Sequence, residues 1–204
     1  MNKDYEYLDV PRWVNVLFIL STIITLCVAG YIYTGALISL LVGVPAMVAL
    51  FFWLTTTYHQ SAPRRIIPWY IGAVLVLLIQ HAEQWHFNYA EQLKLTLPQF
   101  FSDPVVFNEA IFLSIFPFAG LALFLVFATS FYLRRPLGNY MVWFVFVWAI
   151  TSGLTPYLFT LFQESGISYF PGMLGGVLTT GVGVWGCKLL LNIKNIVKED
   201  YSHA

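Results

Sequence analysis

The sequence carries little charge. Only 10% of its 204 residues are Asp, Glu, Lys or Arg, whereas an ordinary soluble domain carries about 25%. The 10 basic residues balance the 10 acidic ones, so no net positive charge is available to attract nucleic acid. The composition therefore argues against a soluble domain and against nucleic-acid binding.

The chain also lacks the short sequence motifs that indicate a known catalytic or cofactor-binding chemistry. It contains no Walker, Rossmann, HExxH, CxxC or nucleophile-elbow pattern. Its two cysteines, Cys27 and Cys187, fall at different depths of the expected membrane topology, so a disulfide between them is not expected. Any function has to be inferred from polar residues outside standard motifs.

Apolar residues dominate instead, at 59% of the chain. A helix needs roughly 20 of them to cross about 30 Å of hydrocarbon. Runs such as IGAVLVLLI are apolar on every face, which excludes the alternating strands of a barrel. We predict an all-α fold, a polytopic membrane helical bundle with six transmembrane helices in one domain, 1–204. The expected spans are 13–33, 36–55, 66–87, 105–133, 137–161 and 169–193.

The basic residues indicate the orientation, because cytoplasmic loops carry the excess of Lys and Arg. With six spans, every basic residue except Lys94 falls on one side of the membrane. We expect both termini to be cytoplasmic and the protein to lie in the plasma (cell inner) membrane. The first apolar stretch is too long for a signal-peptide core and is expected to remain as a helix.

The longest loop between spans is the outer loop 88–104. Its apolar residues recur at helical spacing, which predicts a short amphipathic helix lying on the outer surface. These residues are Tyr89, Leu93, Leu97, Phe100 and Phe101. Such a helix would cap whatever lies beneath it.

The third span ends in a polar cluster after an unbroken apolar stretch. Ionisable residues inside a membrane are expensive, so each is a functional candidate. At about 100° per residue, His81, Gln84 and Asn88 share one face of a helix. Glu83 and His86 share the nearly opposite face. One continuous helix cannot direct all five side chains at a single centre.

The Glu83–His86 pair has the Glu-x-x-His spacing of di-iron carboxylate bundles. A complete site needs more ligands, and Glu109 is the better candidate than Glu164 because an apolar run follows it immediately. We take His81, Glu83, His86 and Glu109 as candidate ligands of a transition metal ion. His81, Glu83 and Glu109 are the candidate catalytic residues, since burial raises a carboxyl pKa toward a useful range. The alternative is an ordinary interfacial helix end whose polar groups satisfy one another.

Glycines repeat along the last span. Gly172, Gly176, Gly183 and Gly186 lie near one face of a helix. Small residues at this spacing allow membrane helices to approach closely. We predict a packing face here rather than a binding site.

Two segments of the chain carry a resemblance to a known family. The segment Gln80-His81-Ala82-Glu83-Gln84-Trp85, which ends an apolar helix, resembles the signature of the HXXEE family of bacterial membrane proteins. The segment Tyr169-Phe170-Pro171-Gly172-Met173-Leu174 is similar to that family's Tyr-x-Pro-Gly segment, and Asn108 matches a polar position between them. The chain departs from the pattern, because Gln80 and Gln84 stand where the family has its histidine and its second glutamate. The resemblance implies a fold and a location, and no reaction.

Two hypotheses of function follow. The first is an outward-facing His/Glu pocket, metal-dependent or acting by acid and base catalysis, that takes a small lipophilic molecule from the bilayer. The second is a non-catalytic accessory subunit whose polar cluster meets protein partners in a larger membrane complex. Transport is disfavoured, because the expected topology places no charged residue near the bilayer midplane.

Overall fold

The computed structural model describes residues 11–57, 64–98, 120, 124, 136–163 and 169–192. All regular structure in these ranges is helical, which confirms the predicted all-α class. The helices are α1 (Arg12–Thr34), α2 (Ala36–Phe52), α3 (Ile67–His86), α4 (Tyr89–Thr96), α6 (Pro136–Thr160) and α7 (Met173–Leu191). A π-helical turn, η1 (Trp53–Thr57), extends α2, and a 3₁₀ turn, η2 (Arg64–Ile66), precedes α3.

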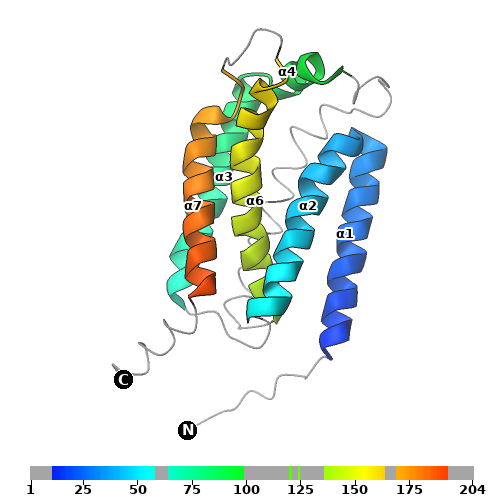
Figure 1. The fold of residues 1–204 in the computed structure, drawn as a ribbon, viewed down its shortest axis with the longest axis vertical. Helices are drawn as coiled ribbons and strands as arrows, with labels where there is room; N and C mark the ends of the chain where they lie inside the picture. The colour runs from blue at the N-terminus through cyan, green and yellow to red at the C-terminus, as the bar shows by residue number, and fades with distance from the viewer. Residues whose placement is uncertain are drawn as a thin grey trace.

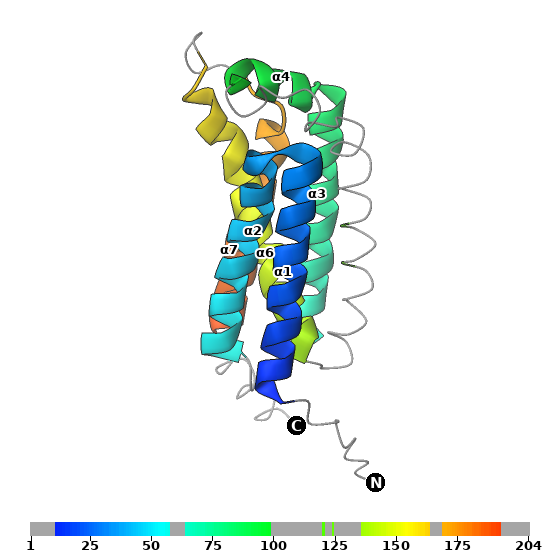
Figure 2. The ribbon, with the colours of Figure 1, turned by 90° about the vertical axis from the view of Figure 1, so that its right-hand side faces the viewer.

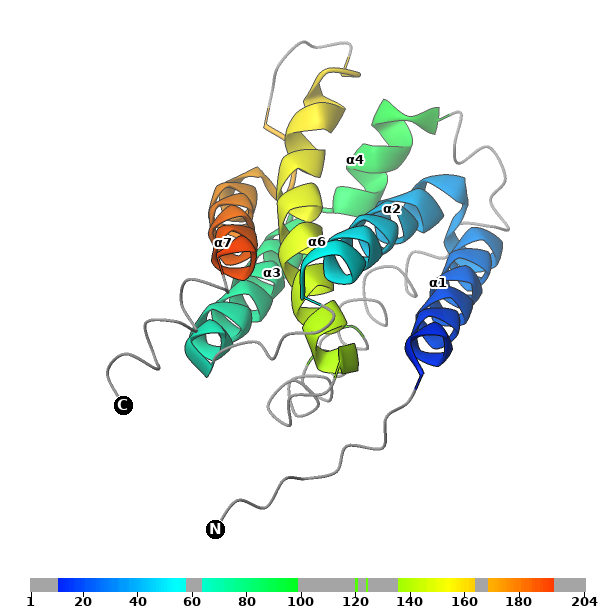
Figure 3. The same cartoon turned by 60° about the horizontal axis from the view of Figure 1, so that its bottom comes forward.

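The central helix of the bundle is α6, which packs against α2, α3 and α7. Figure 3 shows it between α7 and α2, with α1 beyond α2. Its segment 139–147 is buried at every position. By contrast, 17% of the most apolar window of α1 is buried, against 61% for α6. Helix α1 therefore lies at the periphery of the bundle.

Glycines bring α6 and α7 into backbone contact. A Cβ on Gly153 would lie 2.6 Å from the carbonyl oxygen of Gly176, and a Cβ on Gly176 would lie 2.6 Å from that of Gly153. Added carbons on Gly183 and Gly186 would meet Phe146. The predicted packing face is confirmed at Gly176, Gly183 and Gly186, whereas Gly172 precedes the helix.

The bundle has two distinct ends. Figure 1 shows that α3 and α6 end, and α7 begins, at the end covered by α4; we call this the α4 end. Figure 2 shows α4 lying across that end of the bundle. The opposite end holds the first turn of α1, η2 and the last turn of α7. Arg12, Arg65 and Lys188 belong to the opposite end and Lys94 to the α4 end, as expected from the alternation of loops.

The predicted amphipathic helix of the outer loop is present as α4. Tyr89, Leu93 and Leu97 are buried, while Phe100 and Phe101 lie outside the described residues. The chain turns from α3 into α4 at Asn88, whose φ is 53°. Asparagine tolerates this left-handed conformation better than most residues. The turn takes Asn88 off the helical face that it was expected to share with His81.

Four stretches among the described residues are long and apolar enough to cross a membrane: Arg12–Ile32, Ser39–Thr57, Leu137–Thr160 and Met173–Leu191. The expected span 66–87 corresponds to α3, which is not one of the four and ends in the polar cluster. The expected span 105–133 lies outside the described residues except for 120 and 124, which are helical. The last helix begins at Met173 rather than Tyr169, because Pro171 and Gly172 form a turn with a Gly172 φ of 95°.

Candidate functional site

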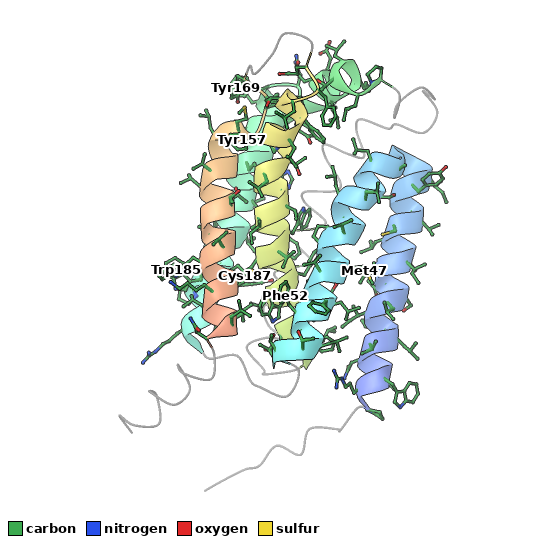
Figure 4. All side chains as sticks on the ribbon, in the orientation of Figure 1. Met47, Phe52, Tyr157, Tyr169, Trp185 and Cys187 are labelled. Atoms are coloured by element: carbon green, nitrogen blue, oxygen red, sulfur yellow. The ribbon has the colours of Figure 1, made fainter. Side chains whose placement is uncertain are left out.

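The carboxylate of Glu83 lies at the α4 end and accepts four hydrogen bonds. Its Oε1 accepts the Tyr169 hydroxyl at 2.6 Å and the backbone N–H groups of Gly172 at 3.0 Å and Leu174 at 3.1 Å. Its Oε2 accepts the backbone N–H of Gly175 at 2.6 Å. Tyr169 is labelled in Figure 4, above the start of α7. We call Glu83 and its four donors the Glu83 cluster.

These donors explain the position of Glu83. The first N–H groups of a helix have no partner within the helix and carry partial positive charge. The residue before α7 is Gly172, which has no side chain to cap them. Glu83, on α3, supplies both the acceptor oxygens and the negative charge. The carboxylate therefore caps α7 from a neighbouring helix.

Two glycines allow α7 to begin so close to α3. A Cβ on Gly175 would lie 2.7 Å from the Cα of Gln80, closer than real Cβ atoms approach backbone. A Cβ on Gly172 would lie 2.8 Å from Nε2 of Gln84, and its positive φ already favours glycine. Larger residues at either position would separate Glu83 from the amides that it binds.

Gln80 extends the polar contacts to α6. Its side chain is completely buried. Nε2 donates to the carbonyl oxygens of Ser152 at 2.8 Å and Gly172 at 3.4 Å, and the Ser152 hydroxyl donates to Oε1 at 3.3 Å. A buried amide is tolerated where its donors and acceptors are used. Gln80 thereby joins α3, α6 and the turn before α7.

His81 belongs to a different face of α3. Its Nδ1 lies 2.9 Å from Oε1 of Gln84, and its ring approaches Trp148 edge-on with centroids 6.3 Å apart. Because a Gln oxygen only accepts, this contact places the proton of a neutral ring on Nδ1. Within the described part of the chain, no group forms a hydrogen bond with Nε2. The predicted common face of His81 and Gln84 is confirmed.

The other predicted ligands do not join these groups. His86 is exposed at the end of α3 and packs its ring against Phe87. Glu83 and His86 share no hydrogen bond or ion pair, although both are described. Glu109, Glu164 and Asn108 lie outside the described residues. In the described ranges, no three His, Cys, Asp or Glu side chains come together to hold a metal ion.

Tyr169 is the side-chain donor of the Glu83 cluster, and sequence reasoning did not propose it as functional. Its phenol is half exposed, and its pKa is raised above the ordinary value, mainly by desolvation and further by the hydrogen bond and charge of Glu83. The only sequence signal was the Pro-Gly pair before an apolar run, which marks a helix start without a side-chain cap.

Comparison with known proteins adds no assignment: no family model matches the chain, and no curated protein or solved structure is significantly similar to it. The two segments that carry the resemblance noted above, 80–85 and 169–174, do contact each other. Glu83 binds Tyr169, Gly172 and Leu174, and Gln80 binds Gly172. Function is therefore inferred from the geometry of these contacts.

Proposed function

We propose that the chain is an integral membrane protein with six transmembrane helices, both termini cytoplasmic, in the plasma or cell inner membrane. The four long apolar helices support this proposal. So does the separation of Arg12, Arg65 and Lys188 from Lys94, because basic residues collect on the cytoplasmic side. The opposite end would then face the cytoplasm and the α4 end the outside.

Helix α3 fits a membrane despite its polar residues. Gln80 and Gln84 face the protein interior, whereas the exposed face carries Ile71, Leu75 and Ile79. Exposed tryptophans, Trp69 and Trp85, lie near its two ends. At about 1.5 Å per residue they are about 24 Å apart along the axis, close to the hydrocarbon thickness. Aromatic residues concentrate at both membrane interfaces.

Within the membrane, we propose that the chain is a non-catalytic accessory subunit of a larger complex. The observation that carries this proposal is the engagement of Glu83, whose two oxygens already accept four hydrogen bonds. These four hydrogen bonds account for the position of the carboxylate without a substrate or a metal ion. The polar cluster then joins helices within the chain, and α1, the least buried of the four long apolar helices that the structure describes, offers a surface for a partner.

One observation favours the enzyme hypothesis. The Nδ1 contact with Gln84 orients His81 and directs its Nε2 lone pair away from Gln84. Histidines that bind a metal or transfer a proton are commonly oriented by a hydrogen bond on the other ring nitrogen. In this alternative, His81 acts on a small lipophilic molecule and Glu83 has a structural role.

Two measurements on protein from native membranes test these proposals. If the chain is an accessory subunit, it is expected to co-purify in a mild detergent with a second protein at a constant ratio through two separation steps. Elemental analysis of chelator-free protein is compared with His81→Ala and with Glu83→Ala. A lone chain that holds one transition metal ion, lost on His81→Ala, would overturn the accessory role and support the enzyme.

A further inference from the structure

An aromatic and cationic cluster lies at the opposite end of the bundle, far along α3 from Glu83. Trp69 on α3 and Trp185 on α7 are 41% and 42% exposed, and their ring centroids are 5.8 Å apart. The Lys188 ammonium lies 5.2 Å from the centre of the Trp185 ring. Figure 4 labels Trp185 low on α7, on the side where α3 lies.

The charged residues that the structure describes near these rings are all basic. Arg65 is exposed on η2, one turn before Trp69, and η2 contacts α7. The acidic residues in the described ranges are Glu83 and Glu91, and both belong to the α4 end. In the part of the chain that the structure describes, the opposite end therefore presents cations and no carboxylate. These described cations are complementary to an anion.

We infer that Trp69, Trp185, Lys188 and Arg65 bind the headgroup of an anionic phospholipid. This inference rests on the proposed membrane location. Indole rings favour the depth of the headgroups, with their apolar bodies toward the acyl chains. The contact with Trp185 holds the Lys188 ammonium at the surface, where its N–H groups can donate to a phosphate. Arg65 adds a second cation that can bind phosphate oxygens.

The site is tested by tryptophan quenching in vesicles. Purified protein is reconstituted in phosphatidylcholine with increasing fractions of brominated phosphatidylglycerol, or of brominated phosphatidylcholine, and a relative binding constant is obtained from the two curves. We expect the wild-type protein to prefer the anionic lipid by about fivefold for each basic residue involved. Lys188→Ala and Arg65→Ala should each lower this preference, and the double variant should bring it near one.

Matched controls assign the effect to this site. Lys94→Ala removes a cation at the α4 end and is expected to leave the preference unchanged. Trp69→Phe with Trp185→Phe should remove the headgroup-dependent quenching while other tryptophans still report insertion. Circular dichroism checks that each variant keeps its helices. Equal quenching by the two lipids in the wild type would overturn the headgroup site, whereas quenching by neither would overturn the membrane location itself.

Discussion

The two ends of the bundle use polar residues in opposite ways. At the α4 end, Glu83 and Gln80 face inward and bond to neighbouring helices. At the opposite end, Lys188 is exposed with its ammonium over the Trp185 ring, and Arg65 is exposed on η2. The difference shows that a polar residue near the end of a membrane-length helix has a structural role when its donors and acceptors are used inside the fold. An exposed cation beside an exposed indole ring, such as Lys188, is instead a candidate for external binding.

Removing the carboxylate of Glu83 is the strongest test of whether the inward polar groups stabilise the fold. Glu83→Ala leaves three backbone amides and the Tyr169 hydroxyl without their acceptor. We expect a loss of about 3 kcal/mol in the free energy of unfolding, because partly buried donors are left unsatisfied. Unfolding in mixed detergent and SDS measures it.

Glu91→Ala is the matched control, since Glu91 is exposed on α4. It is expected to change stability by less than about 0.5 kcal/mol. Glu83→Gln should lose less than Glu83→Ala, because one oxygen remains while the new amide N–H faces that of Gly175. Equal stability of Glu83→Ala and Glu91→Ala would show that the cap contributes nothing.

The second prediction concerns the approach of α7 to α3. Gly175→Ala places a carbon against the backbone of Gln80, and we expect a loss of about 2 kcal/mol from overpacking. Gly181→Ala is the control on the same helix, because nothing lies within 4 Å of its added carbon. It should be neutral or stabilise by about 0.5 kcal/mol, as alanine is the better helix former. A similar loss of unfolding free energy in both variants would mean that the effect arises within α7 and not from its contact with α3.

A smaller effect is expected at Gln80. Gln80→Leu removes the bonds to Ser152 and leaves buried acceptors unpaired, at a cost of about 1.5 kcal/mol. Because Ser152 shares this contact, Ser152→Ala should cost less in the Gln80→Leu background than alone. A double-mutant cycle of unfolding free energies measures the coupling. Strict additivity would mean that the two side chains do not interact.

The smallest effect is expected at Tyr169. Tyr169→Phe removes one hydrogen bond to Glu83, worth about 1 kcal/mol. The raised pKa means that the folded state holds the phenol proton more tightly than the unfolded state. The contribution of the Tyr169 phenol to the free energy of unfolding is therefore fully present below the unfolded pKa of about 10 and is lost as pH rises through the folded pKa. Unfolding is measured at pH 8 and above the unfolded pKa of about 10. The difference in the free energy of unfolding between the wild type and Tyr169→Phe should be smaller at the higher pH. Tyr31→Phe, which changes an exposed tyrosine, is the control.

The long helices α1, α2, α3, α6 and α7 could be predicted because each is a long apolar run, and α4 because its apolar residues recur at helical spacing. The common face of His81 and Gln84 followed from helical periodicity in the same way. The start of α7 was less predictable, since Tyr169 and Phe170 continue the apolar run while the Pro171–Gly172 turn delays the helix to Met173. Apolar composition alone does not predict such a turn.

The role of Glu83 could not be predicted. Its partners are mainly backbone amides, which leave no side-chain pattern, and Tyr169 lies 86 residues away along the chain. The Glu-x-x-His spacing therefore suggested a metal ligand, whereas the structure gives the carboxylate donors from α7 and the turn before it. Glu109 lies outside the described residues, so its part in the metal hypothesis stays a prediction.

The most direct test of Glu83 as the cap of α7 measures hydrogen exchange at the backbone amides that it binds. Glycine-labelled protein allows hydrogen exchange to be measured at Gly172 and Gly175, with Gly181 as an internal reference on α7. We predict that both amides are protected in the wild type with or without a chelator, and that Glu83→Ala removes this protection while Gly181 is unchanged. Loss of protection on chelation alone, or full protection in Glu83→Ala, would contradict the account of Glu83 as the cap of α7.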